Sequence, residues 1–173
     1  MITPIRIAVL VGAVFTAAQS QAHDLAESFI EAIVRPDRLD LFVTVGPATA
    51  RRLIDPAAKP GALTPESFAP IRERLQQEGA ALFTITSVKG RLASTQAEAE
   101  LTEDKDVRFK ITYPRPPVGL LILKAVFLEK LGVGFGGIID ASDTFGHHLG
   151  WDQITWENTT LVVVVPAPGS APK

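Results

Sequence analysis

Three histidines are the residues of this chain best suited to metal chemistry. His23 follows Ser20-Gln21-Ala22, and small residues at the first and last of these positions are typical of a signal-peptide cleavage site. If the leader is removed after Ala22, His23 becomes the first residue and offers an α-amine as well as an imidazole. The reference pKa of such an amine is about 7.7–8.0, so a metal ion can displace its proton at modest cost.

A second imidazole would complete a metal site at this new N-terminus. Three nitrogens in one plane suit Cu(II) or Ni(II), and the second imidazole is predicted to come from His147 or His148. Neighbours on a strand point to opposite faces, so only one could join His23 there, whereas a turn would allow both. The alternative is an exposed terminus and two solvent-facing turn histidines. An aspartate would add an oxygen or orient an imidazole, and the candidates are Asp143, Asp24 and Asp140.

Trp151 and Trp156 form a second candidate surface, which would bind a partner rather than a metal. Tryptophans at the ends of sandwich strands usually cover the rim of the core while the indole N–H stays in water. The same exposure would let them bind a peptide or a carbohydrate.

The sequence contains no motif that indicates catalysis. It has no GxSxG, no HExxH and no phosphate-binding glycine loop. Residues 132–137 are rich in glycine, but no helical pattern follows them, so we expect a bend or bulge between strands. The chain has no cysteine, which excludes thiol catalysis, cysteine zinc sites and disulfides. We therefore predict a non-enzymatic binding or accessory protein.

Residues 1–22 have the layout of a cleaved leader. One arginine precedes an apolar run over residues 7–18, which is shorter than the roughly 20 residues that cross a bilayer. The alternative is an uncleaved membrane anchor. Cleavage of the 173-residue chain would leave 151 residues, enough for one domain, in the periplasm.

The charge and hydropathy of the mature chain exclude some classes of partner. It would carry 16 basic and 19 acidic residues without a basic run, which argues against nucleic acid. The longest remaining apolar stretch, residues 118–139, is interrupted by three charged residues and five glycines. We therefore expect a domain that does not span the membrane after cleavage and whose partner is an envelope or membrane protein.

Alternation of apolar and polar residues predicts a mainly β fold. Residues 28–34 and 38–45 form strands joined through Pro36-Asp37, a turn pair. The stretch Leu161–Val165 is apolar on both faces, which predicts a central strand. Further strands are expected at 82–88, 119–127, 136–140 and 160–165.

The clearest hairpin is predicted at residues 97–113. Paired residues must face the same side of the sheet, so only loops with an odd number of residues satisfy both faces. A three-residue loop, Asp104–Asp106, pairs Leu101 with Phe109 and Glu100 with Lys110. A five-residue loop passes the same test.

One amphipathic helix is predicted at about residues 65–78, after Thr64 as N-cap and with Pro65 at the first helical position. Together these elements predict an immunoglobulin-like antiparallel β-sandwich with one inserted helix. A partly open barrel is the alternative. The domain is expected over residues 23–166, followed by a disordered tail at 167–173.

The order of elements resembles the exported N-terminal domain of hydrogenase/urease accessory membrane proteins of the nickel-uptake type. The segments that carry the resemblance are the histidine after the leader, SFIEAIVRPDRLDLFVTV at 28–45, AEAELTEDKDVRFKITYP at 97–114, GLLILKAVFLEKL at 119–131 and TTLVVVVP at 159–166. The resemblance implies a β-sandwich, a location in the envelope and metal handling. The chain departs from the pattern because the membrane helices that normally follow are not in its sequence.

Overall fold

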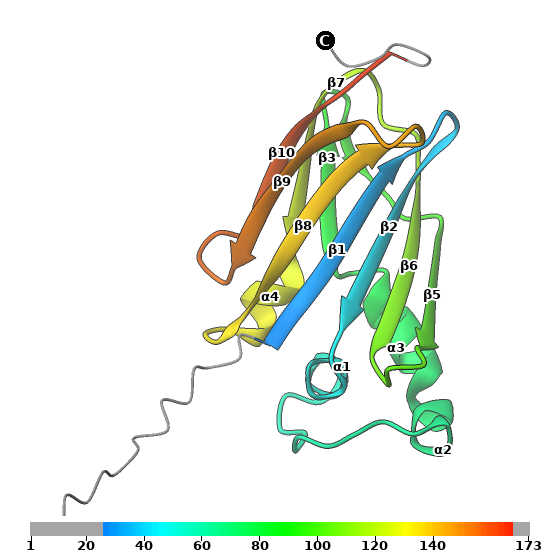
Figure 1. Cartoon of the computed structure of the whole chain (residues 1–173), viewed down its shortest axis with the longest axis vertical. Helices are drawn as coiled ribbons and strands as arrows, with labels where there is room; N and C mark the ends of the chain where they lie inside the picture. The colour runs from blue at the N-terminus through cyan, green and yellow to red at the C-terminus, as the bar shows by residue number, and fades with distance from the viewer. Residues whose placement is uncertain (1–25, 168–173) are drawn as a thin grey trace, which may run out of the picture.

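Two β-sheets face each other across one core in the computed structural model, which describes residues 26–167 (Figure 1). The six-stranded sheet has the order β5-β6-β2-β1-β8-β9, and the four-stranded sheet has the order β10-β7-β3-β4. The predicted β-sandwich is therefore confirmed. The predicted leader, His23, Asp24 and the tail beyond residue 167 lie outside the described residues.

The helices are inserted at two places in the order of strands, after β2 and after β7. The six-stranded sheet contains β1 (Ala26–Val34), β2 (Arg38–Val45), β5 (Gln96–Leu101), β6 (Val107–Pro114), β8 (Phe135–Asp143) and β9 (His148–Thr155). The four-stranded sheet contains β3 (Phe83–Ser87), β4 (Gly90–Leu92), β7 (Gly119–Ala125) and β10 (Thr160–Val165). The helices are α1 (Pro47–Ile54), α2 (Pro65–Phe68), the 3-10 turn η1 (Ala69–Ile71), α3 (Arg72–Gly79) and α4 (Val126–Leu131).

The β1–β2 hairpin forms as predicted, with Val34 opposite Leu39. The prediction of a purely antiparallel sandwich is wrong at one place, because β1 pairs with β8 in parallel. Gly137 makes this pairing possible, since a Cβ atom there would lie 2.0 Å from the carbonyl oxygen of Ser28. The glycine-rich segment thus ends α4 and opens β8.

The preferred register of the β5–β6 hairpin was wrong by two residues. Leu101 pairs with Val107, which leaves the five-residue loop 102–106. Thr102 closes this loop: its N–H donates to the carbonyl of Asp106 at 2.9 Å, and its hydroxyl accepts from the Asp106 N–H at 3.1 Å. Both registers keep the same faces together, so the alternation alone did not separate them.

The prediction of a central position for the last strand is also wrong. β10 lies at the edge of the four-stranded sheet and pairs only with β7. Leu161, Val163 and Val165 point into the core, whereas Val162 and Val164 are exposed. Both faces of β10 carry apolar side chains, but among the described residues only the inward face is covered by the rest of the protein.

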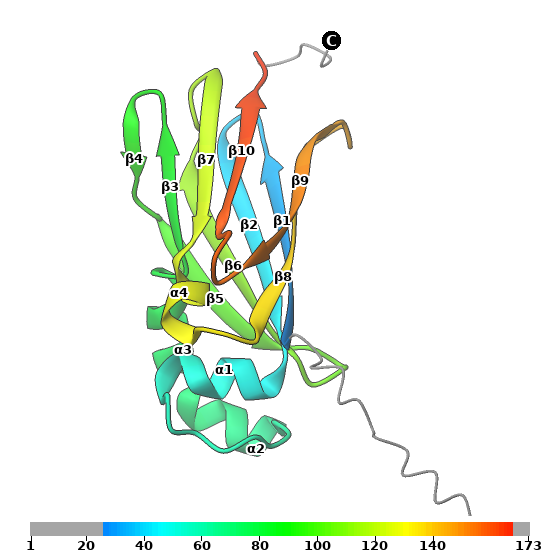
Figure 2. The same cartoon turned by 90° about the vertical axis from the view of Figure 1, so that its left-hand side faces the viewer.

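The predicted helix is confirmed as α2, η1 and α3, with a capping box between Thr64 and Ser67. Two further helices were not predicted. α1 begins with Pro47 and buries Leu53, while α4 replaces the end of the strand expected at residues 119–127. Consecutive buried residues, Phe127 and Leu128, do not fit the alternation of a strand. The helix that carries them, α4, lies toward the same end of the sandwich as α1 and α3 (Figure 2).

Candidate functional site

The β8–β9 hairpin carries both predicted metal-binding histidines. Asp143 is 8 % exposed and organises the turn: one carboxylate oxygen accepts the N–H groups of Phe145 and His147 at 2.8 and 2.9 Å. The other oxygen contacts Nδ1 of His147 at 2.8 Å. Burial alone would raise the pKa of Asp143, but these hydrogen bonds outweigh it and lower the pKa. Asp143 therefore holds the turn together.

His148 has a different partner. It pairs across the sheet with Ser142, and its Nδ1 lies 2.9 Å from Oδ1 of Asp140. Each histidine thus contacts its own aspartate. Among residues 26–167, no three histidine, aspartate or glutamate side chains gather closely enough to hold a metal ion.

The hairpin histidines lie at the end of β8 that is far from the start of the described chain. Ala26 pairs with Phe135 at one end of β8, and Val34 pairs with Asp143 at the other. Eight residues of strand span roughly 26 Å, whereas the three residues from His23 to Ala26 reach at most about 11 Å. With β1 in place, one molecule does not bring His23 to the hairpin histidines.

Both tryptophans are accessible, as the prediction of a partner surface requires. Trp151 is 63 % exposed on the outer face of β9, opposite Asp140, and Trp156 is 43 % exposed in the turn between β9 and β10. They lie on different elements.

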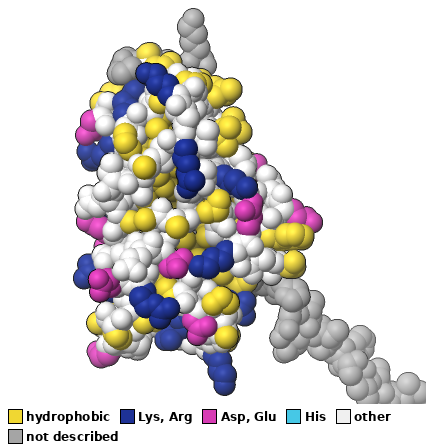
Figure 3. Space-filling view, turned by 180° about the vertical axis from the view of Figure 1, so that it is seen from behind, with side chains coloured by type: hydrophobic (Ala, Val, Ile, Leu, Met, Phe, Trp, Pro, Cys, Tyr) yellow, Lys and Arg dark blue, Asp and Glu magenta, His cyan; other side chains and the backbone are white. Residues whose placement is uncertain are grey.

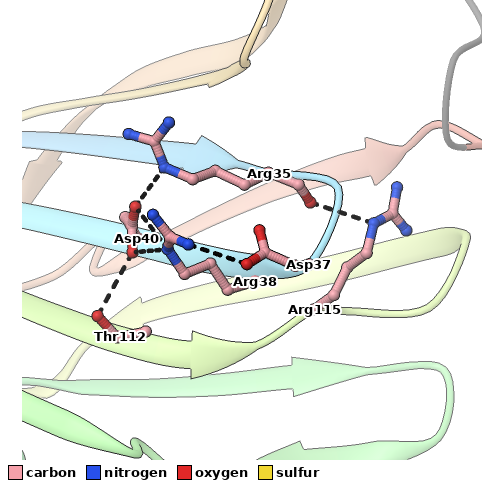
Figure 4. A network of polar contacts seen from close by, with 6 residues as sticks. All are labelled: Arg35, Asp37, Arg38, Asp40, Thr112 and Arg115. Carbon is pink, nitrogen blue, oxygen red and sulfur yellow. Dashed lines mark hydrogen bonds and ion pairs between the residues drawn. The ribbon is translucent and has the colours of Figure 1, made fainter.

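A polar cluster around Asp40 was not predicted. The Asp40 side chain is 1 % exposed, and its carboxylate accepts hydrogen bonds from Nε of Arg35 and from Nε of Arg38, the latter at 3.0 Å (Figure 4). Arg115 donates to the carbonyls of Arg35 and Pro166 at 3.1 and 3.3 Å. Burial alone would raise the pKa of Asp40, but the two arginines lower it. The cluster fastens the β1–β2 turn to the end of β10.

The outer side of the four-stranded sheet presents an apolar surface. We call Leu120, Ile122, Val162 and Val164 the aliphatic face; their exposed fractions run from 37 % to 60 %. They are direct neighbours, because Val162 pairs with Ile122 and Val164 with Leu120. Val88 and Val118, each more than half exposed, adjoin this surface at the ends of β3 and β7.

Lysine and arginine side chains lie among the apolar ones on this side of the molecule, and some acidic side chains are visible there as well (Figure 3). Residues 83–92, 114–125 and 160–166 contain four basic side chains and no acidic one, whereas the other described residues contain 11 basic and 18 acidic. Lys124 pairs with Glu129 of α4 at 2.8 Å. Among the described residues, Lys89 and Arg91 form no ion pair. The sheet therefore combines apolar side chains with two cations, Lys89 and Arg91, that no acidic side chain of the described residues neutralises.

The strand edges offer less to a partner. β5 packs against α3, and Arg72 donates to the outward carbonyl of Ala99 at 3.2 Å. β9 and β10 lie beside each other, and β4 is three residues long. The sheet face is thus more available than any edge.

No protein-family model matches this chain, and no curated protein matches its sequence. The resemblance to nickel-uptake accessory domains stays a prediction. Among the helices of residues 26–167, none combines the length and apolarity needed to cross a membrane.

Proposed function

We propose that this protein is an exported, non-enzymatic binding domain that docks a partner protein on the aliphatic face. The partner segment is apolar and acidic. The leader pattern of residues 1–22 supports a periplasmic location for this binding.

The observation that carries the proposal is the outward side of β10. Its sequence is that of a strand covered on both faces, yet Val162 and Val164 are 54 % and 60 % exposed. Exposed apolar side chains that adjoin one another mark interaction sites more often than isolated ones do. A bound partner would bury the outward side chains of β10, as the core buries the inward ones.

Charge decides which partner fits. Two copies of this face would bring together the Lys89 and Arg91 side chains of both, which form no ion pair among the described residues, with no acid in the same strands, so self-association here is unfavourable. The face also has no aromatic side chain, whereas membrane interfaces are rich in tryptophan and tyrosine. An acidic protein segment satisfies both the aliphatic side chains and the cations.

Site-specific photo-crosslinking in the protein's own cells tests this. A benzoylphenylalanine at Val162 should capture a partner, and mass spectrometry of the crosslinked peptide should locate an acidic, apolar segment. The matched control is Thr44, on the outer face of the six-stranded sheet, which should not capture the same segment.

The purified partner then gives the energetics. Ile122→Lys should weaken its binding about tenfold or more, because the substitution places a charge in the contact. Lys89→Glu should weaken binding in low salt more than in high salt. A crosslink to a second copy, flotation of the protein with anionic vesicles, or equal capture at both positions would overturn the proposal.

A further inference from the structure

A hollow of about 260 Å³ opens on the outer face of the six-stranded sheet, at the end where β1 begins and β2 leads into α1 (Figure 1). One row of paired residues lines it. Thr44 lies opposite Phe29 and Phe29 opposite Ile138, which in turn lies opposite Gln153. Neighbouring strands are about 4.8 Å apart, so this row is roughly 14 Å long. Phe29 and Ile138 are 48 % and 46 % exposed, so a ligand can reach both from the solvent.

Gly46 keeps the hollow open beside this row. A Cβ atom on Gly46 would have no other atom within 4 Å. The alternation along β2 directs that position to the outer face, as it directs Thr44. A larger side chain at residue 46 would therefore extend into the hollow.

Asp106 is the one ionisable residue among those described that line the hollow. Val45 lies opposite Val107, so the register places Asp106 beside Gly46 and on the outer face. Its N–H donates to the hydroxyl of Thr102 at 3.1 Å, whereas its carboxylate has no partner among the described residues. Arg108, two residues along β6, does not neutralise this carboxylate. The Arg108 guanidinium lies over the ring of Phe42 and pairs with Glu31 at 3.7 Å.

We propose that this hollow binds a small organic ammonium ion, a primary amine with an apolar body. The apolar body packs on Phe29 and Ile138, and the ammonium group donates to the Asp106 carboxylate and the Thr44 hydroxyl. Both oxygens are acceptors, and a hydrogen bond between charged groups is the stronger kind. An anion would meet Asp106 with a like charge. The volume lies just below the usual range for ligand pockets, which favours a small ligand. This inference does not depend on the aliphatic face, which belongs to the other sheet.

Nuclear magnetic resonance on the ¹⁵N-labelled protein gives the first test. Titration with 2-phenylethylammonium in the millimolar range should shift the amide signals of Gly46, Asp106 and Gly137, which line the hollow, in a saturable manner. 2-Phenylethanol has the same apolar body without the charge, and it should bind about fivefold more weakly. 3-Phenylpropanoate, which carries the opposite charge, should not bind.

Calorimetry on variants assigns the charged contact. Asp106→Asn should weaken binding of 2-phenylethylammonium about fivefold, because it removes the charge and keeps the shape of the side chain. Asp104→Asn, at an exposed position of the same loop, should bind as the wild type does. Ile122→Lys should also leave the affinity unchanged, which separates this site from the docking face.

A second variant fills the hollow. The backbone of Gly46, with φ −63° and ψ 161°, suits any residue, so Gly46→Leu should fold and should lower the affinity about tenfold or more. Gly61→Leu, in the exposed loop before α2, is the matched control. Circular dichroism checks that each variant folds.

The proposal is overturned if Asp106→Asn binds 2-phenylethylammonium as tightly as the wild type does. It is also overturned if 2-phenylethylammonium and hexylammonium both leave the three amide signals unmoved, since the hollow would then hold water alone.

Discussion

At the scale of single residues, burial changes what a polar side chain does. The alternation of β2 places Asp40 on the solvent face, and the strand does orient it outward. Three neighbours nevertheless enclose it: Arg35, Arg38 and Thr112. The same pattern in sequence could not reveal this, because two of the contacts come from the turn and from β6.

Asp40→Asn should lower the free energy of unfolding by about 1–3 kcal/mol at pH 7, the cost of losing hydrogen bonds between charged groups. The pKa of Asp40 is lowered in the folded state. Its contribution is therefore complete above the ordinary aspartate pKa and is lost as pH falls through the folded value. Urea unfolding at several pH values should show the gap between wild type and variant closing in acid. Asp37→Asn, at an exposed position, should change stability by less than about 0.5 kcal/mol; an equal loss would contradict the argument.

Tyr113 should make the protein sensitive to alkali. The folded-state pKa is about 12, above the unfolded value near 10, so the native state keeps a proton that the unfolded state releases. Stability should fall by roughly 2–3 kcal/mol between about pH 10 and pH 12. Tyr113→Phe should not show this loss of stability between about pH 10 and pH 12. The losses that come from the lysines should be the same in the variant and in the wild type. Parallel losses in both proteins, measured by thermal unfolding, would rule it out.

At the scale of elements, alternation predicted β1, β2 and β6, and the capping pattern predicted the helix at about residues 65–78, because each has one buried side. It missed β9, where the pairing with β8 shifts register between Ala141 and Ser142. The sequence pattern also misplaced β10 in the sheet. Such a pattern shows which faces of a strand are apolar, but it does not show which neighbouring elements cover them. The candidate surface was therefore expected at the tryptophans rather than at the aliphatic face.

The two sides of β10 should respond differently to the same substitution. Val163→Thr places a hydroxyl in the core and should cost about 1–3 kcal/mol. Val162→Thr changes an exposed residue of similar β-propensity and should stay within about 0.5 kcal/mol. Denaturant unfolding of the two variants makes the comparison. Similar losses in both would mean that the outer side is already covered within the molecule.

At the scale of the whole molecule, the sandwich keeps its candidate features apart. The helices close the end at which β1 begins, and the Asp40 cluster lies at the opposite end of β1 (Figure 1). Charge divides in the same way: the segments of the four-stranded sheet contain basic residues and no acidic one, and acidic residues are in excess elsewhere among the described residues. Sequence order could not show this division, because the three segments of that sheet are far apart in the chain.

The same separation predicts the outcome of a metal titration. Protein that begins at His23 should bind Cu(II) equally well before and after His147→Ala and His148→Ala, because neither side chain reaches the terminus. Isothermal titration measures the affinities, and His23→Ala serves as the comparison. A loss of more than about tenfold in either hairpin variant would mean that β1 does not hold its register in solution.

The parallel partnership of β1 and β8 has a consequence for how the molecule assembles. β1 occupies the interior of the six-stranded sheet, yet one of its two neighbours is made only after six other strands and four α-helices have emerged. Such distant closure slows folding, typically to milliseconds or longer. Until Gly137 pairs with Ser28, one edge of β1 in the β1–β2 hairpin has unpaired backbone N–H and C=O groups, which can pair with other chains. A chain that crosses a membrane from its N-terminus would keep this edge exposed until β8 has emerged. A holdase chaperone that covers the edge of β1 would then protect the chain from aggregation.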